Sequence, residues 1–213
     1  MVSNTLDLQA FIAGGTISKT VSATAVITIG DWPNCFYFSD EHDSWGNEKT
    51  AELKAINLLM TYPRYRAGLC QNPQRPIKLI LDTTSFGDEC EVTGDSTIII
   101  RKLCLGGEAN RFYSLAHESG HIYSKRNSDV YIEFINYFRD VIVANGENYL
   151  CSYRGTKTPS EDFAETIAVY LTNKNFANRP YNTCISSANP NGWINLRDNY
   201  PYHYSFAAKG YFD

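Results

Sequence analysis

Apolar residues recur at helical spacing in several long stretches of this chain, and each stretch predicts a helix that buries one face. The first covers residues 48–67, where the apolar positions favour one long, largely buried helix. Residues 108–124 form the second and residues 129–144 the third. The fourth is the run Ser160–Leu171. The chain is therefore expected to be rich in amphipathic helices.

Shorter apolar runs that are rich in β-branched residues predict strands. Ile77–Leu81 and Thr97–Leu103 both lie between the first two predicted helices. Residues 16–30 alternate in the manner of a strand, and residues 31–46 are rich in aromatic and turn-forming residues. We therefore expect strands beside the helices, with a small β-rich subdomain at residues 1–47.

The chain has 213 residues, of which 43% are hydrophobic, and this is enough for one domain with a full core. No repeat or low-complexity linker divides it. We expect a single domain, residues 1–213, whose catalytic core occupies residues 48–173. The tail, residues 174–213, is rich in Asn, Tyr, Pro and Gly and has little periodicity, which predicts an ordered loop that wraps the core.

The second predicted helix carries the sequence His-Glu-Ser-Gly-His, which is typical of zinc hydrolases. His117 and His121 are four residues apart, so both imidazoles project from one face and can point a nitrogen at the same ion. Glu118 lies about 100° further round the helix. Its carboxylate is thus kept off the metal but close to a bound water, for which it can act as general base. Gly120 costs a helix about 1 kcal/mol relative to Ala, which indicates close packing beneath the site or simple tolerance.

Catalytic zinc usually takes three protein ligands and leaves the fourth position to water, so a third ligand is needed. The continuation that supplies a third histidine in metzincins is absent, because residues 122–127 read Ile-Tyr-Ser-Lys-Arg-Asn. The other histidines, His42 and His203, lack helical ligand spacing. Carboxylates further along the chain are better candidates, since Glu161 and Glu165 share one face of the helix predicted there.

An HExxH helix followed further along by Glu-x-x-Ala-Glu resembles the gluzincin metallopeptidases, and above all the group that includes the anthrax lethal factor catalytic domain and the Pro-Pro endopeptidases. The likeness covers roughly residues 96–173. It implies that Glu161 binds zinc as the third ligand. It also implies that Glu165 supports a ligand histidine from outside the metal shell, orienting the ring and raising its basicity.

The same family places a tyrosine seven residues before the ligand glutamate, where its hydroxyl donates to the transition-state oxyanion. This chain has Arg154 at that position. A one-residue insertion in the loop would bring Tyr153 into the role, so Tyr153 is the candidate catalytic tyrosine. Tyr149 or a tyrosine near the C-terminus is the alternative.

The resemblance implies an α+β, zincin-like metallopeptidase domain with a small mixed sheet, an active-site helix and a C-terminal helical part. In such domains a strand just before the zinc helix forms one edge of the cleft and pairs with an extended peptide. Ser96–Leu103 occupies the equivalent place in this chain. An ordinary sheet-edge strand fits the sequence equally well. The implied activity is that of an endopeptidase with one catalytic Zn²⁺, in which Glu118 is the general base for a metal-activated water. The specificity could be narrow, as in toxin-like proteases.

Glu161 also fits a purely structural role. Residues 158–161 match a capping box, with Thr158 as N-cap and Glu161 as the third helical residue. Against this, like charges at Glu161 and Glu165 would destabilise an exposed helix by about 0.2–0.5 kcal/mol, a repulsion that a metal and a histidine would absorb. Asp162 is the fallback ligand, although it projects from a different face of the helix.

The chain has six cysteines, none of them in a CxxC pair, which favours disulfides over a zinc ribbon. We expect the pairs Cys90–Cys104, Cys151–Cys184 and Cys35–Cys70. Disulfides indicate a secreted or extracytoplasmic protein. Six buried free thiols in a cytosolic protein are the alternative.

The net charge of −4 and the lack of a Lys/Arg stripe argue against nucleic acid or an anionic membrane as a partner. No apolar run approaches the ~20 residues needed to cross a bilayer. The N-terminus lacks the charged start and apolar middle of a signal peptide, so we expect that any leader has been removed. The expected partner is a protein or peptide substrate, bound by a monomer.

Two functions from other classes fit the same sequence. The chain could be an inactive, zinc-bearing module that captures an extended peptide without cutting it. It could also be a disulfide-stapled interaction domain in which HExxH is accidental. Bound zinc without turnover would favour the first, and the lack of a stoichiometric metal would favour the second.

Overall fold

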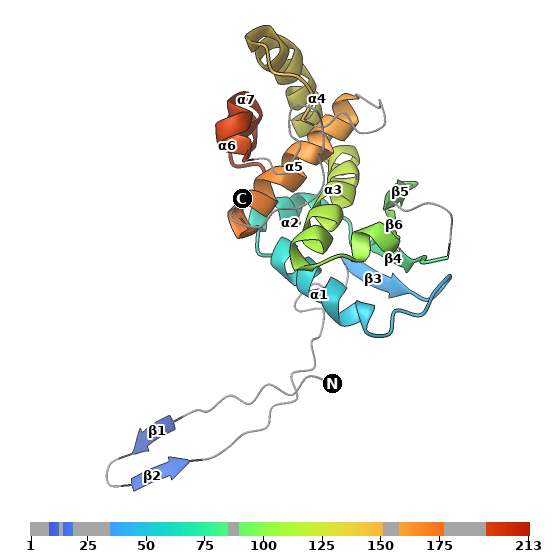
Figure 1. The fold of residues 1–213 in the computed structure, drawn as a ribbon, viewed down its shortest axis with the longest axis vertical. Coiled ribbons are helices and arrows are strands. Elements are labelled where there is room, and N and C mark those ends of the chain that lie inside the picture. Colours follow the sequence, from blue (N-terminus) through green and yellow to red (C-terminus); the bar gives the residue numbers. More distant parts are fainter. Residues whose placement is uncertain (1–8, 13–14, 19–34, 85–89, 151–157, 177–194) are drawn as a thin grey trace. The chain divides into compact units, whose positions relative to one another are not determined.

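The computed structural model describes residues 9–12, 15–18, 35–84, 90–150, 158–176 and 195–213. The chain divides into two compact units, residues 1–30 and residues 31–213. The first unit contains an antiparallel hairpin of β1 (Gln9–Ile12) and β2 (Gly15–Ser18) (Figure 1). The rest of its predicted strand region, residues 19–30, lies outside the described residues. The second unit contains all the predicted metal ligands.

A small mixed sheet lies along one side of the second unit (Figure 1). Its strands are β3 (Phe36–Ser39), β4 (Ile77–Leu81), β5 (Glu91–Thr93) and β6 (Thr97–Ile100), in the spatial order β3-β4-β6-β5. β4 is parallel to both β3 and β6, whereas β5 runs antiparallel to β6. Almost all of β4 is buried, as expected of a parallel strand that helices cover. The sheet and the helices together confirm the predicted α+β class.

The strand predicted at Ile77–Leu81 is confirmed as β4. The strand predicted at Thr97–Leu103 ends at Ile100, because the chain then turns into a 3-10 helix, η1 (Lys102–Leu105). β6 also has a neighbour on each side, so the expectation that this strand edges the cleft is wrong. β5 is the edge strand next to β6, and Gly94, with a φ of 65°, turns the chain from β5 back onto β6.

The first predicted helix is in fact two helices. α1 (Glu48–Leu59) and α2 (Pro63–Leu69) replace the single helix expected at residues 48–67. Pro63 is the reason, because its ring removes a backbone donor and forces the preceding residue out of the helical region. Tyr62 accordingly has φ −87° and ψ 99°, and α2 begins with Pro63.

The two helices that carry the predicted ligands run side by side (Figure 1). α3 (Glu108–Arg126) confirms the second predicted helix, and α5 (Pro159–Phe176) confirms the fourth. They approach closely at Gly120, where an added Cβ would lie 3.0 Å from Cα and 3.3 Å from Cβ of Ala164. Gly120 therefore allows close packing beneath the ligands and is not merely tolerated.

Replacing Gly120 with Val should destabilise the protein, because the added side chain would have to push the backbone of α5 away from α3. We expect the free energy of unfolding to fall by about 2–3 kcal/mol, as in overpacked interiors. Gly120→Ala should cost less, because Ala gains about 1 kcal/mol of helix propensity over Gly. Urea denaturation of the metal-free variants measures both changes. A Val variant as stable as the wild type would show that this approach does not constrain the helices.

α4 (Ser128–Tyr137) lies at the end of the unit away from the sheet (Figure 1). It continues into a π-helical turn, η2 (Phe138–Ile142), and then a 3-10 turn, η3 (Val143–Asn145). These three segments confirm the helix predicted at residues 129–144, with a change of helical type near its end.

The described end of the tail is more regular than its sequence predicts, whereas residues 177–194 of the predicted loop lie outside the described residues. Instead of an ordered loop, residues 195–213 contain α6 (Leu196–Asn199) and α7 (Pro201–Ala207). Local capping explains both helices, because the side chain of Asn195 accepts hydrogen bonds at the start of α6 and Pro201 begins α7. These helices are too short to show a periodic pattern of apolar residues.

Two disulfides link elements of the second unit. Cys35–Cys70 joins the start of β3 to the end of α2, with Cα atoms 5.1 Å apart, and Cys90–Cys104 joins the start of β5 to η1, with Cα atoms 6.2 Å apart. Both are predicted pairs and are confirmed. The predicted pair Cys151–Cys184 lies outside the described residues. Two disulfides are consistent with an extracellular protein.

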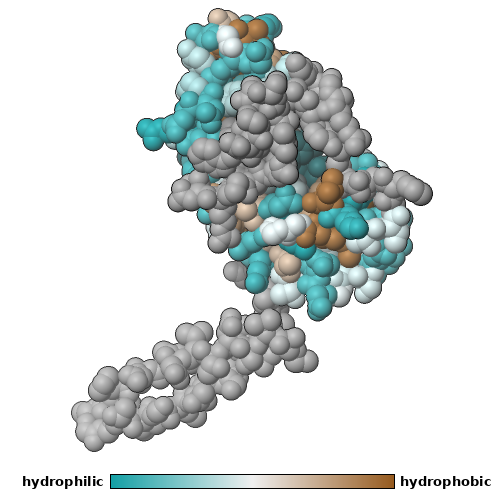
Figure 2. Space-filling model, viewed as in Figure 1, coloured by the Kyte–Doolittle hydropathy of each residue, from teal (hydrophilic) through white to brown (hydrophobic). Residues whose placement is uncertain are grey.

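The core of the second unit lies between the sheet and the helices, and its largest buried side chains are aromatic residues such as Tyr65, Phe112 and Phe163. On the face drawn in Figure 2 the described surface is mostly hydrophilic, with hydrophobic atoms gathered beside η1 and near the α4 end. Leu103 of η1 is 58% exposed. None of the described helices is both long and apolar enough to pass through a bilayer.

Candidate metal centre

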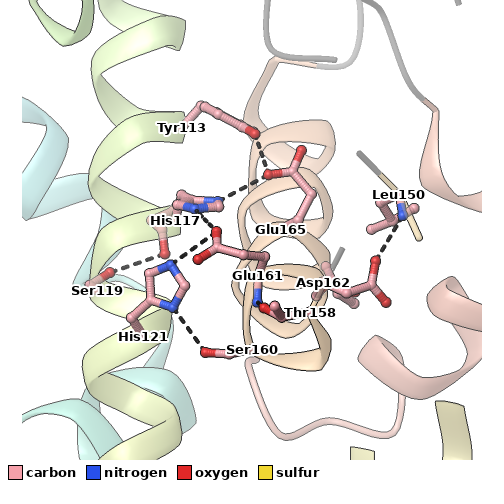
Figure 3. Close-up of polar contacts among 12 residues, drawn as sticks. Tyr113, His117, Ser119, His121, Leu150, Thr158, Ser160, Glu161, Asp162 and Glu165 are labelled. Atoms are coloured by element: carbon pink, nitrogen blue, oxygen red, sulfur yellow. Dashed lines mark hydrogen bonds and ion pairs between the residues drawn. The ribbon is translucent and has the colours of Figure 1, made fainter. Parts of the chain in front are cut away.

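Two imidazoles one helical turn apart form the base of the site. His117 and His121 lie on the face of α3 that meets α5 (Figure 3), with ring centroids 5.0 Å apart and ring planes at 83°. Their side chains are 19% and 14% exposed, so they are shielded from bulk water but accessible. The structure thus brings together the two histidines that the HExxH spacing predicts to be neighbours.

Glu161 reaches this pair from the first turn of α5 (Figure 3). Its Oε2 lies 3.4 Å from Nε2 of His117 and 3.4 Å from Nε2 of His121. The backbone N–H of Glu161 donates to Oγ1 of Thr158 at 3.2 Å, so Thr158 is an N-cap. The cap uses the backbone of Glu161, whereas the carboxylate faces the histidines. The capping role and the ligand role are therefore compatible.

These separations suit a zinc ion. The ligand atoms of His117, His121 and Glu161 all lie within 4.8 Å of one another, and the group could hold a metal ion. Two donors, each about 2.0–2.1 Å from a tetrahedral zinc, lie about 3.4 Å apart. That distance matches the 3.4 Å between each Nε2 and the carboxylate oxygen. Two imidazoles and one carboxylate are also a known donor set of catalytic zinc, so the residues fit the ion.

Each candidate ligand histidine is held through its other ring nitrogen. Nδ1 of His117 lies 3.0 Å from Oε2 of Glu165, which also accepts a hydrogen bond from the hydroxyl of Tyr113 (Figure 3). Nδ1 of His121 lies 3.3 Å from Oγ of Ser160. Such partners fix the ring orientation and the tautomer, and they leave the Nε2 lone pair for a metal.

Tyr113 and Ser160 are supporting residues that the motifs in the sequence do not reveal. Tyr113 precedes His117 by one helical turn and so shares its face of α3, a spacing that is visible in the sequence. Ser160 gives no comparable signal, because only the packing of α5 on α3 shows that its hydroxyl faces His121. Glu165, the residue expected to support a ligand histidine, has its Oε2 3.0 Å from Nδ1 of His117.

The electrostatics of the site favour positive charge. Burial lowers the pKa of His117, but the hydrogen bonds to Glu161 and Glu165 outweigh burial and hold that pKa well above its ordinary value. The contacts with both histidines hold the pKa of Glu161 far below its ordinary value. Glu161 is therefore an ionised carboxylate at neutral pH, and either protonated imidazoles or a metal cation can balance its charge.

Glu118 stands beside the ligand group and not within it. The residue is 7% exposed on the buried face of α3. Burial raises its pKa above the ordinary value, an effect that the nearby imidazoles of His117 and His121 oppose and that Glu161 strengthens. The carboxylate therefore lies near the three candidate ligands, as the HExxH spacing predicts for a general base.

The predicted oxyanion donor, Tyr153, lies outside the described residues and stays a prediction. The alternative Tyr149 stacks on Phe138, with ring centroids 4.8 Å apart. Among the C-terminal tyrosines, Tyr211 donates its hydroxyl to Glu133. Both tyrosines have packing or hydrogen-bonding partners away from the three candidate ligands.

Asp162, the fallback ligand, belongs to a different group. Its Oδ1 accepts a hydrogen bond from the N–H of Leu150 at 2.7 Å (Figure 3), and its Oδ2 lies 2.9 Å from Nε2 of His203. Oε2 of Glu147 lies 2.7 Å from Nδ1 of the same imidazole. Both oxygens of Asp162 are thus engaged elsewhere, which favours Glu161 as the third ligand.

His203 should make the stability of the protein depend on pH. Burial lowers its pKa, but the hydrogen bonds to Asp162 and Glu147 outweigh burial and raise it above 6.5. A raised folded-state pKa contributes stability that is full below the unfolded value of about 6.5 and is lost as the pH rises through the folded value. We expect the stability difference between wild type and His203→Gln to shrink from about pH 6 to about pH 9 in urea denaturation. A difference that stays constant over this range would contradict the expectation.

No protein-family model matches this chain, and no curated protein sequence matches it. The function therefore has to be argued from the geometry and chemistry of the site itself.

Proposed function

We propose that this protein is a zinc-dependent endopeptidase. The observation that carries the proposal is the convergence of His117, His121 and Glu161, with 3.4 Å between each Nε2 and the same carboxylate oxygen. A chance HExxH on a solvated helix face needs no carboxylate from another helix between its imidazoles. It also needs no partners for both Nδ1 atoms, which Glu165 and Ser160 provide here.

A zinc ion bound by these residues would supply Lewis acidity, polarising a peptide carbonyl and making water a better nucleophile at neutral pH. His117, His121 and Glu161 would hold the ion. Glu165 keeps the ring of His117 oriented, and Tyr113 in turn donates to Glu165. The supporting residues therefore restrict the movement of the ligands, which keeps the site ready for substrate.

Glu118 moves the proton in the proposed reaction. Its carboxylate accepts a proton from the attacking water and passes it to the amide nitrogen, so that the carbon–nitrogen bond breaks and the amine leaves. The 7% exposure of Glu118 limits the access of bulk water to this proton transfer. Tyr153 remains the proposed donor to the oxyanion.

The outer edge of β5 is the proposed binding surface for the peptide. β5 is the last strand of the described sheet, so one row of its N–H and C=O groups has no partner strand within it. Glu91 of β5 contributes to the electrostatic surroundings of Glu118, so this edge lies near the candidate site. An extended peptide could add to the edge by main-chain hydrogen bonds.

We also propose that the protein works outside the cytoplasm. The disulfides Cys35–Cys70 and Cys90–Cys104 would persist in an oxidising compartment, whereas cytosolic thiols are kept reduced. The second disulfide closes the segment that contains β5 and β6, so it would also steady the proposed peptide-binding edge.

A proteome-derived peptide library tests the proposed activity better than casein, because a protease of narrow specificity leaves casein intact. We expect zinc-loaded wild type to produce new peptide termini at a defined set of sequences, detected by mass spectrometry. Dialysis against a chelator should stop the cleavage and added zinc should restore it. Stoichiometric zinc without any new termini would contradict the proposal and favour a peptide-binding module.

A further inference from the structure

A buried cluster of charges lies next to the candidate metal centre. It joins Glu147, which follows η3, Asp162 on α5 and His203 on α7. The imidazole of His203 lies between the two carboxylates, 2.7 Å from Glu147 Oε2 and 2.9 Å from Asp162 Oδ2. The side chains of His203 and Asp162 are completely buried, and that of Glu147 is 11% exposed.

The geometry of this cluster fits a doubly protonated imidazole between two carboxylates. A neutral imidazole has one N–H and one lone pair, so it could donate to only one carboxylate. Both ring nitrogens of His203 face carboxylate oxygens at hydrogen-bond distance. The raised pKa of His203 agrees with a ring that carries two protons. One positive charge therefore compensates two buried negative charges.

The surroundings of His203 strengthen these hydrogen bonds. Its ring neighbours are Phe134, Phe138 and Tyr200, with centroid separations of 6.5, 6.2 and 5.8 Å. Of these three residues, only Tyr200 can titrate. Burial raises the pKa of Tyr200, so its phenol is neutral near pH 7. Charge interactions in such apolar surroundings are stronger than in water, and an unpaired carboxylate there is costly.

The cluster holds the turn of α5 that faces the histidines. Ser160, Glu161 and Asp162 are consecutive residues in the first turn of α5. Asp162 Oδ1 accepts from the N–H of Leu150, so the same carboxylate ties the chain before residue 151 to this turn. The first turn of a helix is held by fewer intrahelical hydrogen bonds than its interior, so these side-chain contacts of Asp162 add to its order.

We propose that His203 is a positioning residue of the metal centre, which holds Asp162 and thereby keeps the first turn of α5, with Glu161 and Ser160, against the two histidines. The inference rests on the proposed metal centre. Without the imidazolium, Asp162 would be buried without its positive partner and would move toward water. That movement would rotate or fray the turn that carries Glu161.

The test compares the zinc affinity of folded variants at neutral pH, measured by competition with a chromophoric chelator. His203→Gln removes the charge but keeps hydrogen-bonding capacity, and it should weaken zinc binding about tenfold, as expected of a residue that orients ligands from outside the metal shell. Phe206→Leu is the matched control on the same helix. Phe206 packs on Phe134 and Tyr137, so its truncation should lower the unfolding midpoint without weakening zinc binding.

A second variant and a spectroscopic measurement cover the case in which His203→Gln does not fold. Glu147→Gln removes the charge farther from the metal centre and leaves Asp162 paired, so it should weaken zinc binding by less than about tenfold relative to the wild type. Nitrogen-15 NMR of the metal-free wild type should show protons on both ring nitrogens of His203 at neutral pH. A neutral ring would overturn the proposed arrangement.

The remaining outcomes separate the two proposals. Zinc affinity that is unchanged in His203→Gln, or reduced equally in Phe206→Leu, would overturn the positioning role while the metal centre stands. A wild type that binds no zinc would overturn the metal centre together with the positioning role. A selective loss in His203→Gln, with intact binding in Phe206→Leu, would support the inference.

Discussion

Replacing Glu118 with Gln should reduce peptide hydrolysis by about 10²–10⁴-fold while the protein keeps its zinc, because a neutral amide cannot accept the proton of the attacking water. Glu118 is buried beside His117, His121 and Glu161 without belonging to the group that could hold the metal. Gln has nearly the same shape, so the fold and the ligand positions should be retained. The rate is measured on a peptide that the library identifies, with zinc content determined on the same sample.

Glu108→Gln is the matched control for this change. Glu108 lies on the same helix and is exposed, so the same loss of charge there should leave the hydrolytic rate within a factor of about two. If Glu118→Gln kept the full rate with zinc bound, Glu118 could not be the base. If the variant lost its zinc, the residue would belong to the ligand set or its support.

Replacing Glu161 with Gln should weaken zinc binding by more than about 100-fold, which exceeds the loss expected for residues outside the metal shell. The change removes the one negative charge that lies 3.4 Å from both Nε2 atoms. Neutral amide oxygen is a poor ligand for zinc, and two imidazoles alone do not complete a catalytic site. Zinc affinity is measured on folded protein by chelator competition.

Asp162→Asn distinguishes a ligand role from a general effect on the same turn. Asn keeps an oxygen that can accept from Leu150, although it loses the charge that pairs with His203. It should therefore still bind zinc stoichiometrically, with a loss of no more than about tenfold. The reverse pattern, in which Glu161→Gln binds zinc and Asp162→Asn does not, would move the third ligand to Asp162.

The local parts of the site are readable from the sequence because helix geometry fixes them. Residues four apart share a helix face, so the spacing alone is enough to pair His117 with His121. The same rule applies to Tyr113 and His117, and it marks Tyr113 as a neighbour of the ligand. Thr158 is likewise recognisable as a helix cap from its type and position.

The parts that depend on contacts between distant segments are not readable in this way. His203 lies 41 residues from Asp162 and 56 from Glu147, and no periodicity links them. Ser160 can be assigned to His121 only after α5 is placed on α3. Such contacts arise from tertiary packing. The sequence determines this packing, but no local pattern in the sequence reveals it.

Two elements differ from their predictions for specific physical reasons. Pro63 divides the apolar run at residues 48–67, and its effect on the preceding residue outweighs the helical spacing on either side. β5 has only three residues and forms no apolar run, so β6 is the last strand before the zinc helix that the sequence reveals. The order of strands depends on which neighbours pair, and apolar content does not determine that order.

The central claim is that His117, His121 and Glu161 form a zinc centre, and the most direct test is the metal content of the purified protein. Elemental analysis after dialysis against a weak chelator should find about one zinc per chain in the wild type and little in His117→Ala. A wild type that contains no zinc, even after reconstitution with excess metal, would contradict the account and leave a binding or structural role for a disulfide-linked domain.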